Sequence, residues 1–138
     1  ERLIHEGFSV TGLDCFTDYY SRRTKENNLA NLLQHKRFKF IEADLVEADL
    51  SHIVSRNHAW DFIFHLAAQA DVRVSVADPV FDATVNVIGS LRVIDAAVRG
   101  GAQRIVAAAS GGTGDGPGGE ASWGRAAMCP AVPMPGET

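Results

Sequence analysis

FSVTGLD, at residues 8–14, is a short run of mostly apolar residues that closes on an acidic side chain. Three comparable runs follow along the chain, at residues 38–42, 61–68 and 104–109. The segments between them show the spacing of three and four residues that is typical of helices with one apolar face. Because strands alternate with helices, the sequence predicts a doubly wound α/β fold with a parallel sheet and right-handed crossovers.

The clearest helix is predicted over residues 79–99. Asp78 offers a capping carboxylate directly before Pro79 in the first helical position, and Gly100 and Gly101 end the segment. Its apolar residues form one row of Val80, Thr84, Val87, Leu91, Ile94 and Val98, and a second row of Phe81, Val85 and Ile88.

Two further elements carry expectations. A helix is predicted at residues 24–35, with Thr24 as its cap. The run at residues 61–68 is almost continuously apolar, which predicts a parallel strand covered on both faces.

Composition excludes several classes of protein. The chain has 138 residues, of which 46% are hydrophobic and 22% charged, as in an ordinary soluble globular protein. Its net charge of −4 gives no reason to expect nucleic acid or an anionic membrane as a partner, and no apolar run approaches the roughly 18 residues that span a bilayer. Cys15 and Cys129 lack the spacing of a disulfide framework or a zinc site, so we expect no metal and a cytoplasmic location.

The end of the chain breaks the alternating pattern. Residues 111–138 contain eight glycines and four of the five prolines, without helical or strand period. We therefore predict one domain over residues 1–110 and an irregular tail over residues 111–138. The glycines at residues 114–119 formally match a phosphate-loop pattern, but Pro117 removes a backbone donor and no amphipathic helix follows, so we reject the match.

Asp14 is the first group that points to chemistry. A carboxylate just past a buried strand can accept both ribose hydroxyls of NAD and would repel the 2′-phosphate of NADP; the alternative is a solvated turn residue or a helix cap. In such a unit the first strand and the glycine-rich loop stand about 20 residues earlier, whereas residues 1–7 alone precede this run. The sequence therefore predicts a piece of a larger nucleotide-binding enzyme, with a partial Rossmann-type sheet that lacks its first strand and its phosphate loop.

Polar and small residues follow the next two strands, at the edge where such sheets bind ligands. Asp44 can accept from an adenine amino group while Leu45 lies against the ring, although an aspartate is common in any turn. At the end of the strand at residues 61–68, the small residues at this edge, in the run Leu66-Ala67-Ala68-Gln69, allow a cofactor's ribose and pyrophosphate to lie close to the backbone. His65 sits in an apolar run, so we expect a hydrogen-bonded core histidine rather than a base or metal ligand. Asn86 can bond to a cofactor or to a neighbouring loop's backbone, or stay partly exposed without a role.

These segments resemble the extended short-chain dehydrogenase/reductase family, and within it the nucleotide-sugar epimerases and dehydratases. The resembling segments are VTGLDCFTDYY, FKFIEADL, DFIFHLAAQADVRVSV, DPVFDATVNVIGSLRVIDAA and RIVAAASGGT. Residues 65–97 look most like UDP-glucose 4-epimerases, whereas DCFTDYYSRRTKE is also similar to UDP-glucuronate epimerases and decarboxylases.

The resemblance implies a tightly held NAD that takes a hydride from a carbon of a nucleotide sugar and returns it. The residues carried over to the cofactor are Asp14 and Cys15 for the adenosine ribose, Asp44 and Leu45 for the adenine, Leu66, Ala67, Ala68 and Gln69 for the middle of the molecule, and Asn86 close by. It also implies a homodimer through the helix at residues 79–99. In the family's sheet order, 3-2-1-4-5, the strands at residues 8–13 and 61–67 would lack their common neighbour.

The family's catalytic groups are carried over incompletely. Thr113 and Ser110 are imperfect candidates for the group that hydrogen-bonds the sugar oxygen, because Gly111 occupies the usual serine position. The general-base tyrosine and the lysine four residues after it are absent, since Tyr19 and Tyr20 are the only tyrosines. We therefore expect this piece to be inactive by itself.

Two classes of function follow. The first is an NAD-dependent epimerase that interconverts UDP-glucose and UDP-galactose by transient oxidation at C4; its rivals within the family are UDP-glucuronate epimerases or decarboxylases and other dehydratases. The second is a non-catalytic binding or dimerisation module that uses the long apolar helix as a partner surface. The nucleotide-binding reading needs Asp14, Asp44 and Ala67 to lie along one edge of the sheet.

Overall fold

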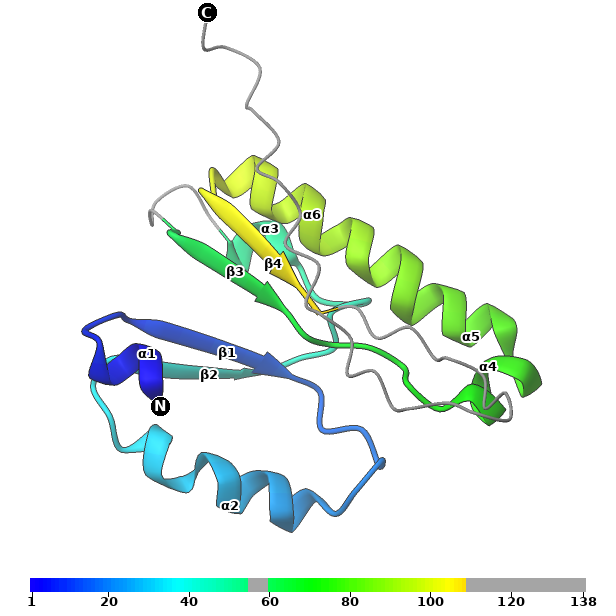
Figure 1. The fold of residues 1–138 in the computed structure, drawn as a ribbon, viewed down its shortest axis with the longest axis horizontal. Coiled ribbons are helices and arrows are strands. Elements are labelled where there is room, and N and C mark those ends of the chain that lie inside the picture. The colour runs from blue at the N-terminus through cyan, green and yellow to red at the C-terminus, as the bar shows by residue number, and fades with distance from the viewer. Residues whose placement is uncertain (55–59, 109–138) are drawn as a thin grey trace, which may run out of the picture. The chain divides into compact units, whose positions relative to one another are not determined.

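The computed structural model describes residues 1–54 and 60–108 of the chain (Figure 1). It divides into two compact units, Glu1–Asp49 and the part that begins at Leu50. The predicted tail over residues 111–138 lies outside the described residues, together with Ser110. In the described ranges, no helix combines the length and the apolar character that a membrane span requires.

The first unit contains a two-stranded parallel sheet. Its elements are α1 (Arg2–His5), β1 (Val10–Asp14), α2 (Arg22–Leu33) and β2 (Phe38–Glu42). The two strands pair in register from Val10 opposite Phe38 to Asp14 opposite Glu42. The chain leaves α1 through Gly7, whose φ of 98° favours glycine.

α2 begins earlier than its leucine spacing predicts. Its cap is Ser21, whose Oγ accepts from the backbone N–H of Thr24 at 3.3 Å. The prediction of Thr24 as the cap is wrong, because this residue lies inside the first turn with its Oγ1 2.8 Å from Ser21 Oγ.

The second unit contains the other parallel pair and most of the helical structure. Its elements are α3 (Leu50–Ile53), β3 (Phe62–His65), α4 (Val72–Ala77), α5 (Pro79–Ala83), the π-helical turn η1 (Thr84–Ile88), α6 (Gly89–Gly100) and β4 (Arg104–Ala107). β3 and β4 pair from Phe62 opposite Arg104 to His65 opposite Ala107. Asp78 caps α5 as predicted, since its Oδ1 accepts from the N–H of Phe81 at 2.9 Å.

The strand pairing confirms the predicted partial Rossmann-type sheet. β1 pairs with β2 and β3 pairs with β4, and the described residues contain no strand that joins the two pairs. These are the pairings that the order 3-2-1-4-5 leaves when its middle strand is taken away. β3 differs from prediction in its cover, because Phe62 and Phe64 on one face remain 39% and 47% exposed.

α4 was not predicted from the sequence. Asp71 caps it by accepting from the N–H of Arg73 at 2.8 Å. The helix contains alternating valines, VRVSV, which is a spacing more typical of strands. Its cap therefore starts a helix that the side-chain pattern alone does not indicate.

The long helix is interrupted by η1. Two hydroxyls bond back to carbonyls one turn earlier: Thr84 Oγ1 to Val80 O at 2.7 Å and Ser90 Oγ to Asn86 O at 2.6 Å. Such bonds compete with the regular helical pattern and bend helices. Sequence spacing predicted one uniform helix, because apolar spacing gives no signal for these hydroxyl bonds.

The face of this helix that packs inside the unit is made of small residues. Gly89, Ala96, Ala97 and Gly100 are buried, and a side chain at Gly100 would collide with the backbone carbonyl of Val54, next to α3. The apolar row predicted from the spacing instead faces outward: Val80, Val87, Leu91, Ile94 and Val98 are 74%, 54%, 56%, 45% and 52% exposed.

Candidate functional site

Two of the predicted site residues meet at the carboxyl ends of β1 and β2. Asp14 is the last residue of β1, and its carbonyl accepts from the N–H of Ala43 at 3.1 Å, one residue before Asp44. Parallel strands that pair in register end at the same edge, where open α/β sheets bind their ligands. Asp14 and Asp44 therefore share an edge, as the sequence predicted; Ala67 belongs to the second unit.

The Asp14 carboxylate bonds to its own turn through one oxygen, which is the turn role that the sequence left open for it. Its Oδ1 accepts from the N–H of Phe16 at 2.6 Å and lies 3.9 Å from Lys25 Nζ, whereas the described residues offer no bond to Oδ2. The side chain is 55% exposed. An exposed carboxylate oxygen at a strand end is a suitable acceptor for a ligand hydroxyl.

Phe16 holds this turn in an unusual conformation. Its φ of 53° lies in the left-handed region, which costs a bulky residue about 1–2 kcal/mol. The ring stacks on Phe40 with centroids 5.2 Å apart, and the guanidinium carbon of Arg22 lies 4.9 Å from its centroid. These contacts offset the backbone strain and fix the direction in which the chain leaves β1.

The other residues of this edge are more ordinary in their surroundings. Asp44 Oδ1 accepts from the N–H of Val46 at 2.7 Å, which is the turn role that the sequence left open for it. Leu45 is 8% exposed and belongs to the small buried core, and Cys15 is an exposed free thiol.

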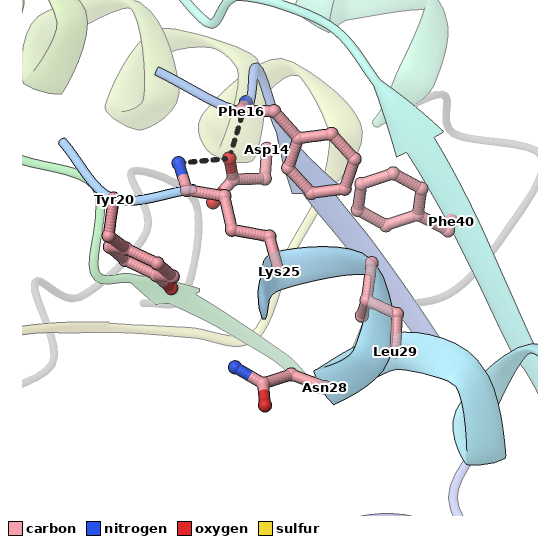
Figure 2. Close-up of a pocket in the computed structure, with 7 residues that line it drawn as sticks. All are labelled: Asp14, Phe16, Tyr20, Lys25, Asn28, Leu29 and Phe40. Carbon is pink, nitrogen blue, oxygen red and sulfur yellow. Dashed lines mark hydrogen bonds and ion pairs between the residues drawn. The ribbon is translucent and has the colours of Figure 1, made fainter. Parts of the chain in front are cut away.

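A pocket of about 130 Å³ lies under the loop that follows β1. Figure 2 shows the side chains that line it: Asp14, Phe16, Tyr20, Lys25, Asn28, Leu29 and Phe40. Sequence reasoning missed Lys25, which is 7% exposed. No sequence signal identifies it, because a lysine near the start of a helix normally lies in solvent.

An ion-pair network joins α2 to the end of β2. Arg22 donates two bonds to the Glu42 carboxylate, at 2.8 and 2.7 Å, and a third to Glu26 at 2.8 Å. These bonds hold the pKa of Glu42 below its ordinary value and raise the pKa of Arg22. The network holds the first turn of α2 against the strand end that carries the candidate site.

In the second unit, one asparagine holds the loop after β3. Asn86 Oδ1 accepts from the N–H of Gln69 at 2.8 Å, and Asn86 Nδ2 donates to the carbonyl of Gln69 at 2.9 Å. Of the roles that the sequence left open, the structure shows the bond to a neighbouring loop's backbone. η1 carries this side chain, which accords with the frequent occurrence of π-helical turns at functional sites.

The Gln69 side chain pairs in the same two-way manner with the backbone of Asp71. Its Oε1 accepts from the N–H of Asp71 at 2.5 Å, and its Nε2 donates to the carbonyl of Asp71 at 2.9 Å. Asp82 Oδ1 accepts from both amide groups, at 3.1 Å from Asn86 and 3.3 Å from Gln69. Because a carboxylate only accepts, Asp82 fixes which way both amides point.

His65 is a hydrogen-bonded, half-buried histidine, as predicted. Its Nε2 lies 2.8 Å from Ser90 Oγ, and Ser90 Oγ donates to the carbonyl of Asn86. Ser90 Oγ therefore accepts a hydrogen bond from Nε2–H, so the neutral ring carries its hydrogen on Nε2. Burial lowers the pKa of His65 below its ordinary value.

The remaining predicted residues divide between the two units and the part of the chain outside the description. Leu66, Ala67 and Ala68 are exposed on the loop after β3, beside the half-buried Gln69. Thr113 and Ser110 lie outside the described residues.

Comparison with known proteins gives the same family from sequence and from structure. The chain is 42% identical over 113 residues to the UDP-glucose 4-epimerase of Mycolicibacterium smegmatis, which covers 82% of this chain and 34% of that protein. Its fold resembles the UDP-glucose 4-epimerase of Thermus thermophilus in complex with NAD, with a TM-score of 0.61, 29% identity and coverage of 79% and 32% of the two chains. It also resembles a variant UDP-glucuronic acid 4-epimerase of Bacillus cereus in complex with a fluorinated UDP-sugar and NAD, with a TM-score of 0.68, 26% identity and coverage of 78% and 34%.

The chain spans about a third of the length of the relatives that it matches. The family model described as GDP-mannose 4,6 dehydratase matches residues 1–112, which is most of the chain. The chain therefore belongs to the GDP-mannose 4,6 dehydratase family, among the extended short-chain dehydrogenases/reductases that include nucleotide-sugar epimerases.

Proposed function

We propose that the protein containing this chain is an NAD-dependent nucleotide-sugar 4-epimerase, and that its substrates are UDP-glucose and UDP-galactose. The identity of 42% to a UDP-glucose 4-epimerase supports the substrate. The alternative within the family is a UDP-glucuronate epimerase or decarboxylase. The structural likeness to a UDP-glucuronic acid 4-epimerase supports this alternative. The protein is proposed to act in the cytoplasm, with no nucleic-acid or membrane partner.

The observation that carries this proposal is the Asp14 carboxylate. It stands at the end of a parallel strand, with Oδ1 accepting from the N–H of Phe16 and with a side chain that is 55% exposed. This arrangement fits the ribose diol of NAD, since a carboxylate accepts from both hydroxyls and repels a 2′-phosphate. Two similar solved structures contain NAD, which supports the same cofactor here.

The other cofactor contacts are proposed from the two units. Asp14 and Cys15 would hold the adenosine ribose, and Asp44 and Leu45 the adenine. The middle of the cofactor would lie on the loop Leu66, Ala67, Ala68 and Gln69, which Asn86 holds through its pairing with the Gln69 backbone. The chemistry that bound NAD supplies is acceptance of a hydride from the sugar C4 and its return.

The sequence contains only some of the groups that would act on the sugar. Thr113 and Ser110 are the candidates for the hydrogen bond to the sugar oxygen. The sequence has no tyrosine followed four residues later by lysine. We therefore expect these 138 residues alone to show no epimerase activity, although they carry the proposed ribose contact.

A coupled assay of the intact protein tests the proposal. We expect turnover of UDP-galactose and little turnover of UDP-glucuronate, and we expect Asp14→Ala to weaken NAD binding. Lys39→Ala, on the exposed side of β2, is the matched control in the same unit. Turnover of UDP-glucuronate in place of UDP-galactose would establish the rival, and failure to bind NAD or turn over either sugar would favour the non-catalytic module.

A homodimer through the helix at residues 79–99 is a second part of the proposal. Its predicted apolar row is exposed along α5 and α6 rather than packed inside the unit. Contiguous exposed apolar side chains are typical of interaction surfaces. A non-catalytic module would use the same face, so dimerisation alone does not distinguish the two functions.

A further inference from the structure

Lys25 is an anomaly in the first unit. Among the described residues it is the one buried charged side chain, at 7% exposure. An ammonium that leaves water loses favourable solvation, which its surroundings must replace. The groups that replace water around the ammonium therefore show which part of the chain Lys25 binds.

The contacts that replace water come from the last residue of β1 and from the loop between β1 and α2. Lys25 Nζ donates to the carbonyl of Thr17 at 2.7 Å and lies 4.9 Å from the centroid of the Tyr20 ring. The Phe16 ring centroid is 5.8 Å away, and Asp14 Oδ1 is 3.9 Å away. One ammonium thus contacts a backbone carbonyl of the loop, two aromatic rings and the carboxylate at the end of β1; Figure 2 shows the rings and the carboxylate.

The position of this charge bears on Asp14. The ammonium and the N–H of Phe16 both address Oδ1, so they hold the carboxylate in one orientation and leave Oδ2 to a ligand. The positive charge also offsets part of the negative field at the strand end. A neutral side chain at position 25 would remove both effects.

We propose that Lys25 is a positioning and specificity-determining residue of the nucleotide site, which holds the loop of residues 14–20 closed and sets the net charge next to the ribose 2′ position. This proposal rests on the proposed function, because it assigns the ribose contact to Asp14. It predicts that Lys25 governs both the closure of the loop and the choice between NAD and NADP.

Loop closure can be measured without any cofactor. The backbone N–H of Phe16 reports on this loop, because it donates to Asp14 Oδ1 at 2.6 Å. In the intact protein, Lys25→Met removes a charge-assisted bond, so we expect this N–H to exchange with solvent deuterium about tenfold faster. Lys25→Arg keeps the charge and should stay close to the parent rate, as should Lys39→Met. A parent rate in Lys25→Met would overturn the role in closure.

The role in specificity needs a double-mutant cycle of Asp14 and Lys25 with both cofactors. Asp14→Asn leaves the Lys25 charge unbalanced beside the ribose, so the ratio of NADP to NAD affinity should rise by about fivefold or more. In Asp14→Asn with Lys25→Met, the part of that gain that comes from the Lys25 charge should be lost, so the ratio should fall between those of the parent and Asp14→Asn. Equal ratios in the single and double variants would overturn the role in specificity.

The two measurements separate this proposal from the proposed function. Faster exchange of the Phe16 N–H in Lys25→Met together with no binding of either cofactor by the parent protein would refute the proposed function and the specificity role but keep the loop role. A parent exchange rate in Lys25→Met together with firm NAD binding would refute the loop role and keep the proposed function. Folding of each variant is checked by circular dichroism, and Lys25→Gln replaces Lys25→Met if the latter fails to fold.

Discussion

Asn86 and the backbone of Gln69 pair in both directions, with the asparagine amide accepting at 2.8 Å and donating at 2.9 Å. The Asn86 amide thereby bonds to both the N–H and the carbonyl of Gln69, as a neighbouring strand would in a sheet. The pairing explains why this loop, which has no regular structure of its own, holds a defined path next to β3. It also gives η1 a purpose, since the π-helical turn presents Asn86 to the loop.

Asn86→Asp should therefore destabilise the second unit. The substitution removes the donor to the Gln69 carbonyl and brings a second carboxylate against Asp82 Oδ1, which now accepts from the amide at 3.1 Å. We expect a loss of about 1–3 kcal/mol in the free energy of unfolding, measured by urea denaturation. Asn31→Asp, at an exposed position of α2, should change it little; equal losses in both variants would contradict the role of the pairing.

Much of the fold could be predicted from the sequence because it depends on local signals. The boundaries of β2 and the start at Asp78 follow from apolar spacing and capping, which act within a few residues. The shared edge of Asp14 and Asp44 follows from parallel pairing, which places successive strand ends together.

The parts that could not be predicted depend on contacts between segments far apart in the sequence. Nothing near Asn86 indicates that its amide meets Gln69, and nothing near Lys25 indicates that a loop folds over it. The outward direction of the row that includes Leu91 is a further case. Periodicity shows that a helix has an apolar face, but not whether its own unit or a partner covers that face.

The half-buried His65 should make stability depend on pH. Burial lowers its folded-state pKa below the ordinary value of 6.5, so the unfolded chain binds a proton first as the pH falls. The neutral ring's contribution to stability is therefore complete above about pH 6.5 and is lost as the pH falls from there through the lower folded-state pKa. Urea midpoints between pH 5 and pH 8 should show this slope.

His65→Gln should flatten that slope, because glutamine can still donate to Ser90 Oγ but does not titrate. His5→Gln, at an exposed position, is the matched control and should leave the slope unchanged. The assignment to His65 would be refuted by a slope that persists in His65→Gln and vanishes in His5→Gln.

Gly100 should be intolerant of any side chain. An added methyl group would collide with the carbonyl of Val54, and a backbone atom cannot turn aside as a flexible side chain can. We expect Gly100→Ala to cost about 1–3 kcal/mol of unfolding free energy. Gly101→Asn is the control, because its position is open, and asparagine tolerates a φ of 72° better than most residues. If Gly101→Asn proved the more damaging of the two, close packing would not be the reason for Gly100.

The exposed row on α5 and α6 gives the last prediction. Leu91 is 56% exposed in the middle of that row, with Val87 and Ile94 on either side along the helix. In a homodimer through this helix, a glutamate at position 91 would be buried against an apolar partner surface, which is costly without a pairing cation. Leu91→Glu should therefore shift the intact protein from dimer to monomer in analytical ultracentrifugation.

Leu33 provides a matched control, because it is also 56% exposed but lies on α2 in the first unit. Leu33→Glu introduces the same charge and removes the same apolar area, so a general effect of charge on association would appear in both variants. A dimer that survives Leu91→Glu would place the interface elsewhere and leave the outward row without its proposed partner. A monomeric Leu91→Glu variant that still binds NAD would show that the row serves assembly and that the cofactor contacts at Asp14 do not depend on it.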